Sequence, residues 1–164
     1  MGGRGYSSAA SRVADTSYRL QHQATDSGGL LTDISAASDP EGWGASGPGS
    51  YMPSDVYEHP EWYFGMNEVG ARESFAIEKA LRNADPDTEI TVYRGAPKPE
   101  LNTGDWIAIS KEYADIYAYD NSYSDNPNSK TYSYKVKVKD VVWQGDDIRE
   151  FGYFGKNLKY KGGK

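Results

Sequence analysis

The chain has 164 residues, of which 37% are hydrophobic, and this length suits one domain with a core of its own. Its 24 acidic and 18 basic residues give a formal net charge of -6, which argues against binding to a phosphate backbone as the main function. The chain has no cysteine and only 2 histidines, which excludes a disulfide framework and leaves too few ligands for a thiolate or histidine metal centre. No apolar run reaches membrane-spanning length and the N-terminus lacks a signal-peptide pattern, so we expect a cytoplasmic protein without a membrane partner.

The N-terminal part of the chain is expected to hold little regular structure. Residues 1–16 are rich in Gly, Ser and Ala and are predicted to be disordered. The following "SYRLQHQA" has the pattern of a short strand, on which Arg19 and His22 form an unusual polar pair. These two residues either line a ligand cleft, bind a partner or are satisfied within the fold. Residues 38–49 are predicted to be a loop from their Gly and Pro, and residues 51–65 an ordered loop that packs its aromatic rings.

Residues 67–84 carry the strongest helical pattern. Apolar residues recur at helical spacing along one predicted face, made of Ala76, Ile77, Ala80, Leu81 and Ala84. Asn67 is a suitable N-cap, and the sequence "DPD" at 85–87 ends the helix.

After this helix the apolar period changes to two, which predicts strands. They are expected at 89–97, 105–110, 131–138 and 146–154, with a further strand or turn at 140–145. A helix of two or three turns is expected at 111–120 and a loop at 121–130. Helices followed by mostly antiparallel strands indicate an α+β fold. The domain is expected to span residues 17–157, followed by a basic tail at 158–164.

Arg94 is the first polar residue that the pattern places on an apolar row. It shares a predicted strand face with Ile90 and Val92, where a guanidinium is costly unless an anion meets it. Either a carboxylate of the protein or the phosphate of a ligand would satisfy it. The planar guanidinium suits a diphosphate because it donates two parallel hydrogen bonds.

Ser110 and Glu150 are two further candidates. Ser110 stands where a predicted strand meets a helix, as a favoured N-cap or as a hydroxyl that reaches a cleft. Glu150 shares strand parity with Ile148, whereas Phe151 lies on the opposite side, so this carboxylate is also predicted on an apolar side. Taken alone, each residue has a structural explanation, a helix cap for Ser110 and an ion pair for Glu150.

Taken in order, "VYRG", then "WIAIS" before a helix, then "DDIRE" on a late strand resemble the arginine–serine–glutamate class of mono-ADP-ribosyltransferases. The resemblance is strongest to the small ADP-ribosyltransferase-like proteins of bacteriophages and bacteria, some of which disarm host defence, including anti-CRISPR members. It covers about residues 90–153. It implies an ADP-ribosyltransferase-like fold of two small, mainly antiparallel sheets packed together with flanking helices. It also implies that NAD is the substrate and that the partner is a protein target, for which a host defence system is one candidate.

The resemblance also implies a role for each motif residue. Glu150 would stabilise the positive charge that develops on the ribose of NAD when nicotinamide leaves. Arg94 would grip the diphosphate or the nearby ribose, and Ser110 would orient Glu150. Helix tyrosines would stack on nicotinamide, unless they pack the helix onto the sheet. The residues expected to contact NAD are Arg94, Gly95, Ser110, Tyr113, Tyr117, Arg19 and His22.

The sequence departs from the family pattern at two places. The usual Ser-Thr-Ser triplet is replaced by Ser110-Lys111-Glu112, and Ile148 stands where arginine-modifying members carry a second glutamate. Arginine is therefore not the expected acceptor. Asn, Asp, Glu and a nucleic-acid base stay open as acceptors, and water as the acceptor would make the protein an NAD glycohydrolase.

Two non-enzymatic functions also fit the sequence. The acidic balance and small size suit a protein that blocks a partner or mimics DNA, although the acids alternate with bases rather than forming long runs. A module that keeps the NAD-binding fold but only binds a partner is the other alternative.

Overall fold

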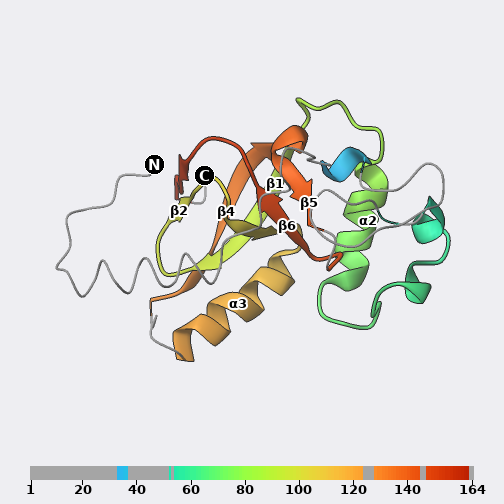
Figure 1. The fold of residues 1–164 in the computed structure, drawn as a ribbon. Helices are drawn as coiled ribbons and strands as arrows, with labels where there is room; N and C mark the ends of the chain where they lie inside the picture. The colour runs from blue at the N-terminus through green and yellow to red at the C-terminus, as the bar shows by residue number, and fades with distance from the viewer. Residues whose placement is uncertain (1–32, 37–51, 53, 124–127, 145–146, 163–164) are drawn as a thin grey trace.

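The computed structural model describes residues 33–36, 52, 54–123, 128–144 and 147–162. Its main element is a five-stranded antiparallel sheet with the order β4-β1-β3-β6-β5 (Figure 1). The strands are β1 (Glu89–Ala96), β3 (Trp106–Ala108), β4 (Lys130–Lys137), β5 (Val141–Trp143) and β6 (Glu150–Tyr153). A second, two-stranded antiparallel sheet joins β2 (Glu100–Leu101) to β7 (Leu158–Lys159). The predicted α+β class with antiparallel sheets is confirmed, and the two sheets are of unequal size.

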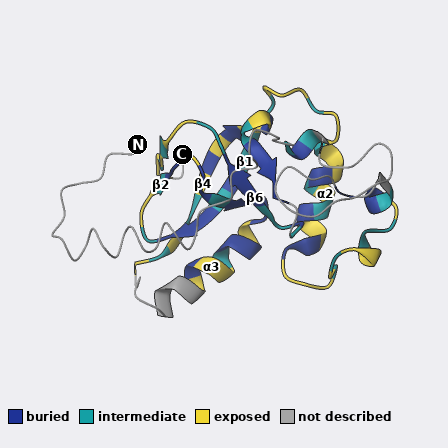
Figure 2. Ribbon diagram, in the orientation of Figure 1, coloured by how far each residue is buried: buried dark blue, intermediate teal, exposed yellow. Residues whose placement is uncertain are grey.

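One face of the large sheet, here called the core face, carries the main hydrophobic core (Figure 2). Val92, Ile107 and Phe151 on three neighbouring strands are each at most 3% exposed and pack in this core. Helix α2 (Ala71–Leu81) and the short helices η1 (Ile34–Ala36) and η2 (Ser54–Tyr57) add the remaining apolar side chains. Burying these side chains is the main source of stability in a chain of this size.

The opposite face, here called the α3 face, is smaller and less apolar. The strand register pairs Tyr93 with Ala108 and Ala108 with Glu150, so the three side chains point to this same face. Helix α3 (Lys111–Tyr123) covers it and contacts β1, β3 and β4. The sheet therefore separates a dry core from a helix-covered face that bears a carboxylate.

Helix α2 begins later than predicted and buries a different set of residues. Its N-cap is Gly70, with a left-handed φ of 75°, rather than Asn67. A side chain at Gly70 would also come within 2.8 Å of the Ser110 hydroxyl, so the close approach of α2 to α3 selects glycine here. Tertiary packing thus overrides the apolar periodicity, because Ser74 and Glu78 are fully buried while the predicted face alanines are not.

The alanines in question, Ala76 and Ala80, are exposed, whereas Ile77 and Leu81 do pack against the core. The helix ends at Leu81, four residues before the predicted "DPD" stop, and Asn83 then adopts a left-handed φ of 61°. Asparagine tolerates this conformation better than most residues.

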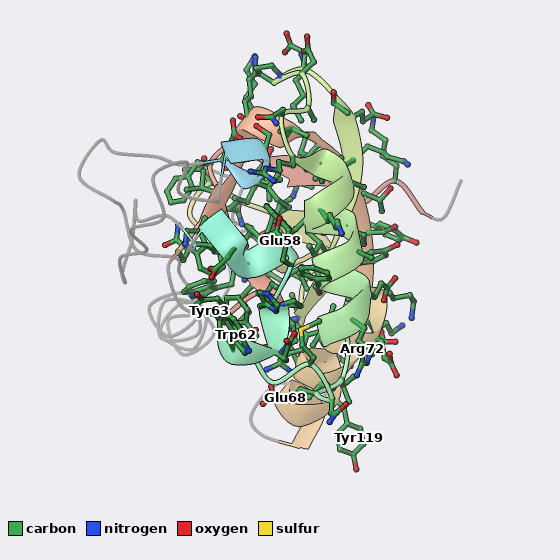
Figure 3. The ribbon with its side chains drawn as sticks, turned by 90° about the vertical axis from the view of Figure 1, so that its right-hand side faces the viewer. Glu58, Trp62, Tyr63, Glu68, Arg72 and Tyr119 are labelled. Carbon is green, nitrogen blue, oxygen red and sulfur yellow. The ribbon has the colours of Figure 1, made fainter. Side chains whose placement is uncertain are left out.

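The aromatic segment 51–65 is ordered where the structure describes it, as predicted. It forms η2 and η3 (Pro60–Trp62), and Tyr57 is buried in the core. Trp62 is 63% exposed and stacks on His59 with ring centroids 3.9 Å apart. Figure 3 labels Trp62 and Tyr63, two exposed aromatic residues of this segment.

The C-terminal region differs from its prediction at two places. Strand β6 begins only at Glu150, because residues 147–149 form a turn closed by the Glu150 amide on the Asp147 carbonyl. The predicted basic tail at 158–164 begins with β7, which pairs with β2. Tyr160 then packs against the core through Tyr132 and Tyr134. The sequence missed β7 because two residues are too short for any periodicity.

The other elements predicted in the C-terminal half are present, with shifted bounds: β3 and β5 are shorter than predicted. Strand β4 alternates as expected, with Tyr134 and Val136 buried and Lys135 exposed. Helix α3 continues to Tyr123 and so runs three residues into the predicted loop. The predictions for residues 1–16, 17–24 and 38–49, including Arg19 and His22, lie outside the described residues.

Candidate functional site

A pocket of about 290 Å³ opens where α3 crosses the three central strands. Strands β1, β3 and β6, which carry the three sequence motifs, are consecutive neighbours in the sheet. The pocket is lined by Tyr93, Arg94, Gly95, Trp106, Ile107, Ala108, Tyr113, Ala114, Tyr117 and Glu150. Five of the predicted site residues therefore meet at one place, although the motifs are far apart in the chain.

Glu150 is the only carboxylate among the lining residues. As the first residue of β6 it pairs with Ala108 and faces α3, whereas Phe151 points into the core. The Tyr113 hydroxyl donates to Glu150 Oε1 at 2.7 Å, and the Tyr117 hydroxyl donates to the same oxygen. The two hydroxyl oxygens are 3.0 Å apart. One carboxylate oxygen is thus held by two phenols from adjacent turns of α3.

The environment keeps both phenols protonated. Burial raises the pKa of Tyr117 to about 12, and the hydrogen bond to Glu150 adds to this rise. Burial and the hydrogen bond to Glu150 raise the pKa of Tyr113 still further. A phenolate beside the Glu150 carboxylate would be repelled by it, so both tyrosines act as hydrogen-bond donors over the physiological pH range.

Arg149 supports this arrangement from the neighbouring turn. Its guanidinium lies 4.3 Å from the centroid of the Tyr113 ring, within the range of a cation–π contact. Asp147 accepts two hydrogen bonds from it, at 2.9 Å and 2.7 Å, and Glu68 forms a further ion pair at 2.5 Å. These carboxylates raise the pKa of Arg149, with the Asp147 hydrogen bonds as the largest cause. Sequence reasoning missed this role because it placed residues 146–154 on one strand, whereas residues 147–149 form a turn that brings Arg149 onto Tyr113.

Arg94 is placed differently from Glu150. Strand alternation directs its side chain to the core face, since Tyr93 shares the α3 face with Glu150. Only 6% of Arg94 is exposed, its Nε lies 3.5 Å from Asp105, and its guanidinium donates to the Trp106 carbonyl at 2.6 Å. The protein's own carboxylate therefore meets the guanidinium, which is one of the two outcomes that the sequence left open. A contact with a ligand phosphate would require this pairing to be exchanged.

Ser110 caps α3 and does not contact Glu150 in the described part of the chain. Its hydroxyl donates to Glu73 on α2 at 2.8 Å and lies 3.4 Å from the Tyr113 amide. The side chain is fully buried. The contact with Glu150 that the resemblance implied for Ser110 is made instead by the tyrosines of the following helix.

Gly95 allows the helix to approach the sheet. A side chain at Gly95 would stand 2.5 Å from the Ala118 amide nitrogen and 2.6 Å from the Ala114 carbonyl oxygen. Such distances to backbone atoms cannot be relieved by a rotamer change. The glycine of "VYRG" is therefore required by packing, whatever ligand the pocket takes.

Two aromatic walls of the pocket were not among the predicted site residues. Tyr93 projects onto the α3 face, and Trp106 pairs with Gly152 in the next strand. The alternation of β1 already separated Tyr93 from Arg94, and this signal could have identified Tyr93 once the ligand face was known.

Comparison of the chain with protein-family models, curated proteins and solved structures found no match. Among the described residues, no helix combines the length and apolar character needed to span a membrane. Within the same part of the chain, no three or more His, Asp or Glu side chains gather as metal ligands would.

Proposed function

We propose that this protein is an NAD-dependent mono-ADP-ribosyltransferase and that Glu150 is its catalytic carboxylate. One observation carries the proposal: Glu150 stands in a pocket, fixed by two phenols, on one of the three adjacent strands that bear the motifs. A carboxylate in a defined rotamer is what a reaction with a developing cation requires.

The reaction would break the bond between the nicotinamide nitrogen and C1′ of the ribose. The electron pair of this bond leaves with nicotinamide, which becomes neutral, and positive charge develops at C1′. Glu150 stabilises this charge and accepts a hydrogen bond from a ribose hydroxyl. An acceptor oxygen or nitrogen then bonds to C1′ and loses its proton to the solvent.

The dimensions of the pocket suit one part of the dinucleotide. Its volume of about 290 Å³ is at the small end of ligand pockets, which hold roughly 300–1,000 Å³. A nicotinamide ring and its ribose fit this space beside Tyr93 and Trp106. The diphosphate and adenosine would extend beyond it, where Arg94 becomes a phosphate ligand only if it leaves Asp105.

The acceptor is proposed to be a residue other than arginine. Ile148 occupies the position of the second glutamate of arginine-modifying members and is only 2% exposed. Without a base at this position, arginine is not expected to act as the acceptor. A more reactive group on a protein target, or water, is expected to act as the acceptor instead. We propose a protein target, with components of host defence as the first to test, and keep NAD glycohydrolysis as the second candidate.

The test is incubation of host extract with the protein and labelled NAD, followed by mass spectrometry for added ADP-ribose. We expect Glu150→Gln to lower NAD turnover on the order of 100- to 1,000-fold while the protein stays folded and still binds NAD. Glu89→Gln, an exposed carboxylate at the start of β1, serves as the matched control and should retain wild-type turnover.

The outcomes separate the candidate functions. Label on a protein supports the transferase, and free ADP-ribose without label on protein supports the glycohydrolase. If wild-type protein neither consumes NAD nor transfers label, the catalytic proposal fails and a non-catalytic binding function remains.

A further inference from the structure

Both tyrosine hydroxyls that contact Glu150 donate to the same oxygen, Oε1. We propose that Tyr113 and Tyr117 are positioning residues that hold Glu150 in one orientation and leave its other oxygen, Oε2, to the ligand. This inference rests on the proposed function and adds to it, since the resemblance gave the orienting role to Ser110 and base stacking to the tyrosines.

The geometry of α3 makes this pair suitable for the role. Tyr113 and Tyr117 are one helical turn apart, so their side chains lie on the same side of the helix. Their rings meet edge to face with centroids 5.2 Å apart, and the two hydroxyls converge on Glu150. The two rings therefore restrain each other as well as the carboxylate.

The tyrosines are in turn held by a rigid surround. The backbone of α3 at Ala114 and Ala118 packs directly on Gly95 of β1, which fixes the height of the helix above the sheet. Arg149 lies over the Tyr113 ring and is held by Asp147. The Tyr113 ring, 7% exposed, cannot swing away without breaking the Arg149 contact, and the Tyr117 ring, 36% exposed, is held by its contacts with Tyr113 and Glu150. Glu150 is therefore positioned before any ligand arrives.

The two oxygens of the Glu150 carboxylate have different roles in this arrangement. The carboxylate oxygen Oε1 already accepts two hydrogen bonds and is occupied, whereas no described residue donates to Oε2. A ribose hydroxyl would therefore bind Oε2. With both phenols committed to Glu150, Tyr93 and Trp106 are the aromatic residues left to stack on a base.

The kinetic test compares Tyr113→Phe, Tyr117→Phe and the double variant with wild type. Each substitution keeps the ring and removes one donor to a charged acceptor. We expect the double variant to lower kcat by about 10- to 100-fold with a KM for NAD near the wild-type value. Tyr119→Phe is the matched control, since Tyr119 is 61% exposed on the same helix and points outward (Figure 3).

The kinetic outcomes discriminate a positioning role from the alternatives. A double variant with wild-type kcat would overturn the inference. A raised KM with unchanged kcat would also overturn it, because it would mean that the tyrosines bind the nucleotide rather than hold the carboxylate.

A second measurement does not depend on turnover. In a double-mutant cycle of Tyr117→Phe and Glu150→Ala, thermal unfolding should show non-additive shifts in Tm, because each single change removes one partner of the same hydrogen bond. Additive shifts would overturn the inference even in an active enzyme. If wild-type protein fails to consume NAD, the proposed function falls, whereas non-additive shifts would still establish that Tyr117 holds Glu150.

Discussion

The two faces of the central sheet each carry a charged side chain, and the two side chains have different kinds of partner. On the core face, Arg94 is 6% exposed and is met by Asp105, a carboxylate of the same protein. On the α3 face, the side chain of Glu150 accepts hydrogen bonds from two neutral phenols, in a pocket that opens beside α3. The guanidinium of Arg94 is already paired with an opposite charge of the protein. The carboxylate of Glu150 instead accepts hydrogen bonds from uncharged groups. The pocket and its carboxylate therefore lie on the α3 face, and the paired guanidinium lies on the core face.

The largest expected effect on stability comes from removing the buried charge of Arg94. Arg94→Met leaves the Asp105 carboxylate, itself 3% exposed, without its buried cation. We expect a loss of about 3–5 kcal/mol in the free energy of unfolding, measured by urea denaturation. Adding Asp105→Asn should recover part of this loss, because no uncompensated charge then remains. Wild-type stability in Arg94→Met together with a raised KM for NAD would instead make Arg94 a ligand residue.

Gly95 tests how closely the α3 face must be packed. Gly95→Ala forces a methyl group against the backbone of α3, and we expect a loss of about 3 kcal/mol in unfolding free energy. The shifted helix should also reduce NAD turnover, since it carries Tyr113 and Tyr117. Gly65→Ala is the control, because the three atoms nearest to the added methyl group there all belong to the side chain of Glu68, and no backbone atom is among them. Equal stability of the two variants would contradict the close packing.

Glu78 is a second buried ionisable group, and unlike Arg94 it makes stability depend on pH. It is fully buried on α2, both of its carboxylate oxygens lack a hydrogen-bond partner, and burial raises its pKa well above the usual value, with Asp147 adding to the rise. The folded state therefore binds a proton more tightly than the unfolded state. The stability that this proton provides is present below the unfolded pKa and is lost as the pH rises toward the folded pKa.

We expect the free energy of unfolding to fall by at most about 1.4 kcal/mol per pH unit from this one group above its ordinary pKa. Glu78→Gln should remove that slope and be more stable than wild type at alkaline pH, as measured by urea denaturation at a series of pH values. Glu89→Gln, at an exposed position, should leave the slope unchanged. A wild-type slope in Glu78→Gln would show that another group binds the proton.

Local patterns determined much of what positions the site. The alternation of polar and apolar residues predicted β1 and β4, and a helix was expected directly after Ser110, a favoured N-cap. The same alternation placed Glu150 opposite Phe151, and the structure agrees. These features follow from one strand or one helix at a time, so a single sequence is enough to state them.

Only the tertiary structure decided which motif residues meet. Alternation predicted that Arg94 and Glu150 each lie on a definite side of their own strands. The register through β3 then determined that these two sides are opposite faces of the sheet. The contact between Tyr113 and Glu150 joins residues 37 positions apart, and no periodicity within α3 or β6 encodes it. Likewise the packing of α2 against the core determined which of its faces is buried. Strand pairing and helix docking depend on contacts between residues far apart in the chain, so no local run of residues determines them.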